Sequence, residues 1–148
     1  METPMRLMLL SIIALLAFNN AAHETITPVQ QVQRAELVVL GKLSDRKELN
    51  AEYAAATLTF KEVLKGDKAL KTVKVRFLAK PGNTATWTYE GTEEGLWFLI
   101  PAGEGMYETF HANGLIRTTF TEIEAQKQVN EYIAEVREII KQTPKTVK

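Results

Sequence analysis

Apolar and polar positions alternate with the two-residue period of β-strands through the middle of the chain. The first strand-like stretch, residues 35–43, departs from this alternation because it is apolar on both faces. One face carries Leu37, Val39 and Leu43, and the other carries Val38 and Leu40. We therefore expect a strand that is covered on both sides. Gly41 lies within it and allows the sharp bend or bulge that a small closed barrel requires.

The stretches that follow predict four further strands and the turns between them. After a polar turn over Ser44–Glu52, Thr57–Phe60 alternates cleanly. Val63–Leu64 is out of phase with it, which predicts a bulge near Lys61-Glu62. Lys65-Gly66-Asp67 is a turn signal.

The later strands differ in how far they are covered. Residues 72–77 alternate Val and Phe with Thr, Lys and Arg, which is typical of a strand with one wet face. Leu96–Ile100 is apolar throughout, so we expect it to be covered on both sides, with Pro101 as its end. Met106–Phe110 is expected to be the last short strand.

Two capping boxes predict two helices. Thr27, Pro28 and Gln30 favour a short helix through Arg34, and Thr121–Glu124 favours a second. The second helix has one apolar stripe, made of Val129, Tyr132, Ile133, Val136, Ile139 and Ile140. A five-stranded barrel of order 1-2-3-5-4-1 would place its first and fourth strands side by side, as a platform for that stripe.

These elements predict a mainly β fold with α: a five-stranded OB-type closed β-barrel plus a C-terminal amphipathic helix. The chain of 148 residues suits one domain, over residues 23–142, with a flexible tail at 143–148. Met1–Ala22 has the pattern of a signal peptide, because Arg6 precedes the apolar run Leu7–Phe18. We expect a secreted or periplasmic protein without a membrane span after cleavage; the alternative is an uncleaved anchor or a buried helix.

Composition removes several kinds of chemistry. With 18 basic and 18 acidic residues, the chain lacks the positive field that nucleic-acid binding needs. The absence of cysteine removes thiol catalysis and Cys-ligated metal. Ser44 and Ser11 are the serines, and neither has a placed base. We therefore expect no enzyme and no cofactor.

Several short motifs resemble the netrin-like module of the tissue inhibitors of metalloproteinases. They are Pro28-Val29-Gln30-Gln31, Ala35-Glu36-Leu37-Val38-Val39 with Gly41-Lys42, Val63-Leu64-Lys65-Gly66 and Gly95–Leu99. The resemblance covers roughly His23–Phe110 and implies the OB-type barrel and a protein partner, such as an extracellular protease. Members of that family chelate the target's zinc through a disulfide-clamped N-terminal cysteine, and this chain has no cysteine.

The candidate binding residues lie at the expected mature N-terminus and between the third and fourth strands. Cleavage after Ala22 would make His23 and Glu24 the new N-terminus. Thr84, Trp87 and Tyr89 belong to an excursion between the third and fourth strands, and exposed aromatics there would be recognition anchors. The alternative is a hairpin whose aromatic rings pack on the barrel.

Two other functions stay open. An N-terminal amine with the imidazole of His23, completed by His111, would chelate copper and make the chain a copper-binding protein or an oxidative enzyme. The chain could also be a structural envelope protein. We expect a secreted binding module that acts as a monomer.

Overall fold

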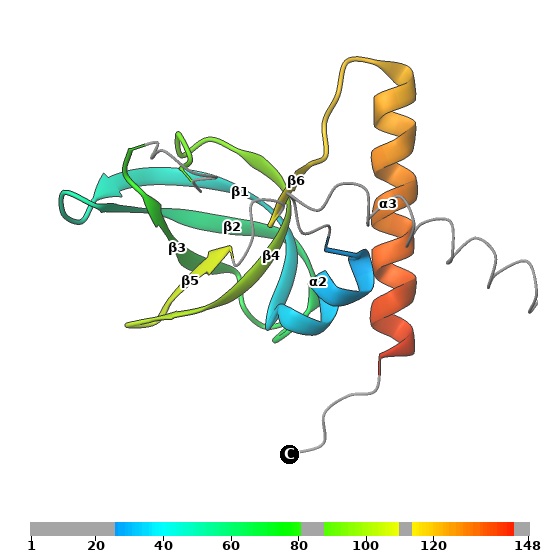
Figure 1. The fold of residues 1–148 in the computed structure, drawn as a ribbon, viewed down its shortest axis with the longest axis horizontal. Helices are drawn as coiled ribbons and strands as arrows, with labels where there is room; N and C mark the ends of the chain where they lie inside the picture. The colour runs from blue at the N-terminus through cyan, green and yellow to red at the C-terminus, as the bar shows by residue number, and fades with distance from the viewer. Residues whose placement is uncertain (1–25, 81–87, 110–113, 144–148) are drawn as a thin grey trace, which may run out of the picture.

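The computed structural model describes residues 26–80, 88–109 and 114–143, which form mainly β sheet with two helices (Figure 1). In chain order the elements are α2 (Pro28–Arg34), β1 (Leu37–Glu48), β2 (Tyr53–Lys65), β3 (Thr72–Leu78), β4 (Glu94–Gly103), β5 (Met106–Thr109), β6 (Leu115–Arg117) and α3 (Ile123–Gln142). Neither helix is long and apolar enough to cross a membrane.

The strand pairings form a ring of five. β1 pairs with β2, β2 with β3, β3 with β5, β5 with β4, and β4 again with β1, so the predicted pairing order is confirmed. The β3–β5 pair is parallel and short, and the other pairs are antiparallel. β6 continues along the edge of β4 that β5 leaves, opposite Gly95–Trp97.

β1 separates two hydrophobic clusters, as its two apolar faces predict. Leu37, Val39 and Leu43 point into an inner cluster enclosed by the strands, together with the fully buried Trp97. On the outer side of β1 and β4 lies a second cluster, formed by Val32, Ala35, Val38, Leu64, Leu96, Phe98 and Val136. The expectation that both strands are covered on both sides is therefore confirmed.

The predicted bulge in the second strand is also confirmed. Glu62 pairs with Leu40 and Phe60 with Gly41, which leaves Lys61 as the extra residue on β2. An extra residue reverses the alternation, so Phe60 and Val63 both contact the inner cluster although they are an odd number of positions, three, apart.

Two glycines let neighbouring strands pass unusually close together. Gly41 and Gly95 are paired opposite each other on β1 and β4. A Cβ at Gly41 would lie 2.6 Å from the carbonyl oxygen of Thr59, and one at Gly95 would lie 2.3 Å from that of Ile116. A side chain at either position would therefore push β2 or β6 away.

Three expected boundaries were wrong. β1 continues through the expected turn to Glu48, because hairpin arms exposed to water need no apolar pattern. β4 continues past Pro101 to Gly103; β1 no longer pairs with β4 beyond Leu99, so the missing N–H of Pro101 disrupts no bond to β1. The last strand is β6, whose three residues are too few to show a period.

The first helix is as predicted, and the second starts differently. Thr27 and Gln30 form the capping box of α2, with both reciprocal hydrogen bonds present. The second predicted box is wrong, because α3 begins at Ile123 with Glu122 as an N-cap that makes no side-chain bond. Gln126 instead accepts from the backbone N–H of Phe120 and so fixes the entry to the helix.

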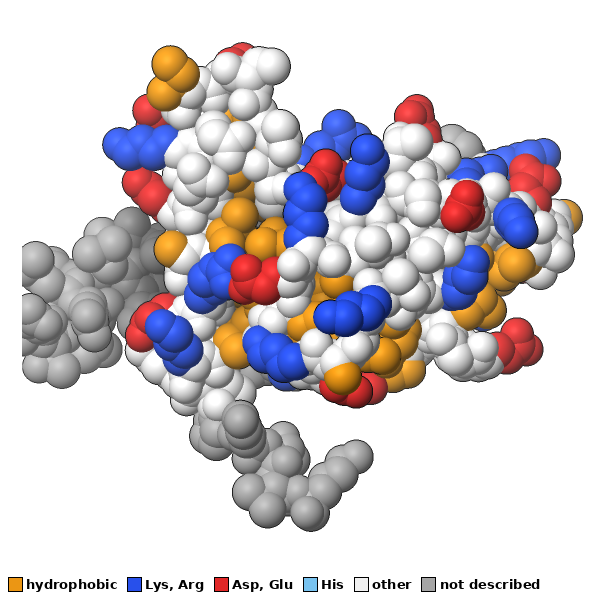
Figure 2. All heavy atoms as spheres, turned by 180° about the vertical axis from the view of Figure 1, so that it is seen from behind, with side chains coloured by type: hydrophobic (Ala, Val, Ile, Leu, Met, Phe, Trp, Pro, Cys, Tyr) orange, Lys and Arg blue, Asp and Glu red, His pale blue; other side chains and the backbone are white. Residues whose placement is uncertain are grey.

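α3 stands beside the strands, with α2 next to its C-terminal half (Figure 1). Its predicted apolar stripe packs on the outer cluster, and hydrophobic side chains gather in the seam between helix and strands (Figure 2). The hydroxyl of Tyr132 donates to Gln31 on α2, and Arg137 forms an ion pair with Glu62 on β2. The helix therefore contacts α2 and β2 as well as the expected platform.

Candidate functional site

The structure locates one of the sequence-predicted site residues. Tyr89 is described, whereas His23, Glu24, Thr84, Trp87 and His111 lie outside the described residues, as do residues 1–22 and 144–148. The proposed copper pair and the mature N-terminus therefore remain predictions.

A recess of about 920 Å³ opens beside Tyr89, and we call it the loop-base recess because the two ends of loop 80–88 border it. Its lining residues are Arg46, Ala79, Thr88, Tyr89, Glu90, Thr92, Glu93, Glu94, Arg117 and Thr119. It reaches from the end of β3 to the residues around the end of β6. β3 pairs with β5 only at Lys74 and Val75, so the strands leave room here.

Tyr89 occupies that room instead of projecting as an exposed anchor. Its ring meets those of Phe77 on β3 and Trp97 on β4 edge to face, each at 5.3 Å between centroids. Its hydroxyl lies 3.2 Å from that of Thr109 on β5. Burial raises the pKa of the Tyr89 hydroxyl. For Tyr89, the structure agrees with the alternative in which the aromatic ring packs on the strands.

A bulge in β1 directs Arg46 toward the recess. Between Ser44, which pairs with Thr57, and Lys47, which pairs with Ala55, β1 has one residue more than β2. Asp45 in this bulge has a left-handed backbone with φ of 55°. Bulges of this kind change the direction of the neighbouring side chain, and here that side chain is Arg46.

The Arg46 guanidinium joins the two ends of loop 80–88. Its Nη2 donates to the carbonyl of Ala79 at 2.9 Å, and its Nε donates to the carbonyl of Tyr89 at 3.1 Å. It also lies 5.7 Å from the ring centroid of Phe77. A planar fork with several donors suits two carbonyl acceptors. We call this arrangement the Arg46 bracket.

Glu93 fixes the chain that follows the bracket. Its carboxylate accepts hydrogen bonds from the backbone N–H groups of Glu90, Gly91 and Thr92, at 2.8–2.9 Å. Gly91 has φ of 102°, and a Cβ there would lie 2.6 Å from the Cβ of Arg46. Only glycine combines this conformation with so close an approach. Arg46 therefore holds both ends of the loop, and Glu93 holds the residues that follow it.

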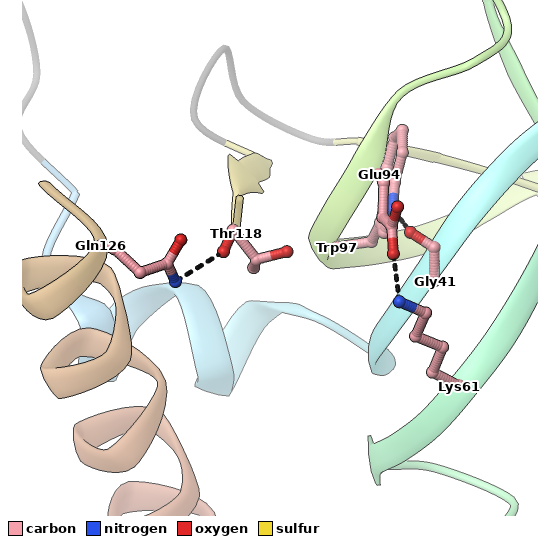
Figure 3. A network of polar contacts seen from close by, with 6 residues as sticks. All are labelled: Gly41, Lys61, Glu94, Trp97, Thr118 and Gln126. Carbon is pink, nitrogen blue, oxygen red and sulfur yellow. Dashed lines mark hydrogen bonds and ion pairs between the residues drawn. The ribbon is translucent and has the colours of Figure 1, made fainter. Parts of the chain in front are cut away.

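The carboxylate of Glu94, the next residue, forms an ion pair on the outer side of the strands. Glu94 on β4 forms an ion pair with Lys61 on β2, and the pair passes over β1 next to Gly41 (Figure 3). This hydrogen bond lowers the pKa of the Glu94 carboxyl. Behind it, the indole N–H of Trp97 donates to the carbonyl of Gly41 at 3.0 Å. The carboxylates of Glu93 and Glu94 are therefore both engaged within the chain.

The recess offers polar groups that a binding partner could contact. Arg46, Glu93 and Glu94 are engaged, which leaves the exposed charges of Glu90 and Arg117 and the hydroxyls of nearby threonines for a partner. Among the residues that the structure describes, no three His, Asp or Glu side chains could hold a metal ion. Ser44 is exposed on β1 opposite Thr57.

Sequence reasoning missed Arg46 and the role of Glu93. Nothing in the local pattern marks Arg46, because it lies in a run that reads as a polar turn. The signal for Glu93 was the turn sequence Glu90-Gly91-Thr92, in which a carboxylate close by can accept the free backbone donors.

Comparison with protein-family models and with curated proteins finds no match for the chain.

Proposed function

We propose that this chain is a secreted or periplasmic, non-catalytic binding module whose partner is a protein. The binding surface is loop 80–88 together with the loop-base recess. The observation that carries the proposal is the Arg46 bracket, which joins both ends of that loop through one guanidinium. A loop with a fixed base is a common form of recognition element on a rigid scaffold.

The scaffold in this proposal is an OB-type closed barrel. Support comes from the pairing order β1-β2-β3-β5-β4-β1, its parallel β3–β5 pair and the bulged, glycine-containing β1. OB-type barrels commonly bind ligands on the face of their second and third strands and through adjoining loops. Tyr89 fills the opening between β3 and β4, so the interior is packed and binding belongs to the rim.

The partner class we propose is an extracellular protease, because of the resemblance to the metalloproteinase inhibitors. Trp87 and Thr84 on the loop would be the contact residues, with His23 and Glu24 at the mature N-terminus beside them. A large aromatic side chain on a loop whose two ends are joined has the character of a binding hot spot.

The first test is a binding and inhibition screen against secreted metallo-, serine and cysteine proteases, with protein of verified N-terminus. Arg46→Ala should weaken binding about tenfold, because the loop must then be ordered on binding. Arg46→Lys should recover only part of it, since a single ammonium does not reproduce the fork. Arg34→Ala, an exposed arginine on α2, is the matched control.

Two further variants locate the surface. Trp87→Ala should reduce partner binding and leave the melting temperature nearly unchanged. Adding one residue before His23 tests whether the terminus takes part, because it displaces the α-amine by roughly 3.3–3.6 Å. If no protease is bound and Trp87→Ala changes no partner affinity, the proposed function is wrong.

A further inference from the structure

A polar face lies on the outside of β1, β2 and β3. The register places its residues in two rows across the three strands: Lys42, Thr59 and Thr72 in one, and Ser44, Thr57 and Lys74 in the other. Five of the six are exposed and Thr57 is half-buried. We call these six residues the lysine–threonine face.

The face carries positive charge without a carboxylate of its own. Lys42 and Lys74 form no ion pair with any residue in the described ranges. Lys74 donates to the hydroxyl of Thr57 at 2.7 Å. At the margins, the carboxylates of Glu94 and Glu108 are already paired with Lys61 and Arg76. The remaining groups are ammonium donors and hydroxyls.

We propose that the lysine–threonine face binds an acidic segment of the protein partner. Carboxylates of that segment would accept hydrogen bonds from Lys42, Lys74 and the threonine hydroxyls between them. The proposal rests on the proposed function, because the face adjoins the loop-base recess: Glu94, which lines the recess, is the β4 residue opposite Lys42 in the strand register. A partner bound at the recess would cover both.

The chemistry of the face fits a polypeptide better than a lipid surface. Electrostatic membrane binding uses clusters of roughly four to eight Lys or Arg, commonly with apolar anchors. Here two unpaired lysines lie among hydroxyls. The large hydrophobic residues that the described ranges expose are Val29, Leu49, Phe120 and Ile123, and none is on this face. Alternate side chains of an extended peptide, about 7 Å apart, match neighbouring rows of a sheet.

The test measures binding of poly-L-glutamate at about 0.15 M ionic strength, where the Debye length of about 8 Å screens charges outside the contact. Lys42→Glu/Lys74→Glu should weaken binding at least about tenfold, because like charges then face each other. Lys127→Glu/Lys141→Glu on α3 has the same net charge and should bind within about twofold of the unmodified protein. Lys42→Gln/Lys74→Gln should lie between them, with an unchanged melting temperature. Equal loss in the two charge-reversed variants would overturn the proposal.

Two outcomes separate this inference from the proposed function. If Arg46→Ala weakens binding of an identified protease while the lysine–threonine variants bind it normally, the recess is the site and the inference is wrong. If the Lys42 and Lys74 variants instead lose binding to phosphatidylglycerol vesicles and keep binding to poly-L-glutamate, the face binds lipid and the inference is again wrong.

Discussion

Tyr89 connects β3, β4 and β5 at the end of the molecule where β3 and β5 are no longer paired. Its ring contacts Phe77 and Trp97, and its hydroxyl lies within hydrogen-bond distance of Thr109. The same residue offers its carbonyl to Arg46. One residue therefore closes the interior and forms one end of the Arg46 bracket.

We expect Tyr89→Ala to lower the free energy of unfolding by about 3 kcal/mol, since it empties a largely filled site between two aromatic rings. Tyr89→Phe keeps the ring and should cost about 1 kcal/mol through the hydrogen bond. Urea unfolding of both variants measures this. A loss below about 1 kcal/mol for Tyr89→Ala would show that the ring contributes little to the core.

Among the elements, β1 and β4 depend on the Gly41–Gly95 pair. Gly41 leaves room for the backbone of β2 at the carbonyl oxygen of Thr59, and Gly95 leaves room for that of β6 at the carbonyl oxygen of Ile116. With a side chain at Gly41, β1 could not stay this close to β2, and with one at Gly95, β4 could not stay this close to β6. The glycines thus determine how sharply the strands curve around the inner cluster.

Gly41→Ala and Gly95→Ala should each lower the unfolding free energy by about 1–3 kcal/mol, because backbone atoms must move. Gly103→Ala is a useful comparison, since a Cβ there meets nothing within 4 Å and only its φ of 86° is unfavourable. That variant should lose about 1 kcal/mol. Equal losses for all three glycines would mean that close packing is unimportant at Gly41 and Gly95.

The sequence predicted elements wherever side-chain burial alternates, and it failed where the backbone alone decides. The two faces of β1, the bulge at Lys61 and the stripe on α3 all follow from apolar spacing. The exposed arm of β1 and the three residues of β6 are held by pairing to a neighbour, which leaves no periodic trace. At the site, Arg46 was missed because a bulge, invisible in composition, gives it its direction.

At the scale of the whole molecule, α3 is held to the strands by apolar contacts and by the ion pair between Arg137 and Glu62. The Arg137 guanidinium donates through Nη2 to Glu62 Oε1 at 3.0 Å, and a second contact joins Nη1 to Oε2. The hydrogen bond from Arg137 holds the pKa of the Glu62 carboxyl below its ordinary value of 4.5. Both side chains are more than a third exposed, so solvent weakens the pair.

A lowered carboxyl pKa makes stability depend on pH in one direction. The contribution of Glu62 is complete above its unfolded-state pKa, and it is lost as the pH falls through the lower folded-state pKa. Glu62→Gln should therefore cost no more than about 1 kcal/mol at pH 7 and almost nothing near pH 2. Urea midpoints at both pH values measure the difference.

Glu138→Gln is the matched control for that experiment. Glu138 is also a glutamate paired with a base, Lys141, but both residues lie on α3 and are 4.0 Å apart. Its replacement should change the unfolding free energy by only a few tenths of a kcal/mol at either pH. A Glu62→Gln loss that stays constant from neutral to acid pH would contradict the assignment to this ion pair.

The Arg46 bracket also has a consequence for protein engineering. Since the guanidinium joins Ala79 and Tyr89 directly, the chain between them can change without changing where it leaves and re-enters the strands. Doubling the length of a flexible loop costs only about 0.6 kcal/mol in closure entropy. A foreign peptide inserted between Lys80 and Thr88 would therefore start and end at a fixed pair of points, so that the cysteine-free chain could present chosen sequences in reducing as well as oxidising surroundings.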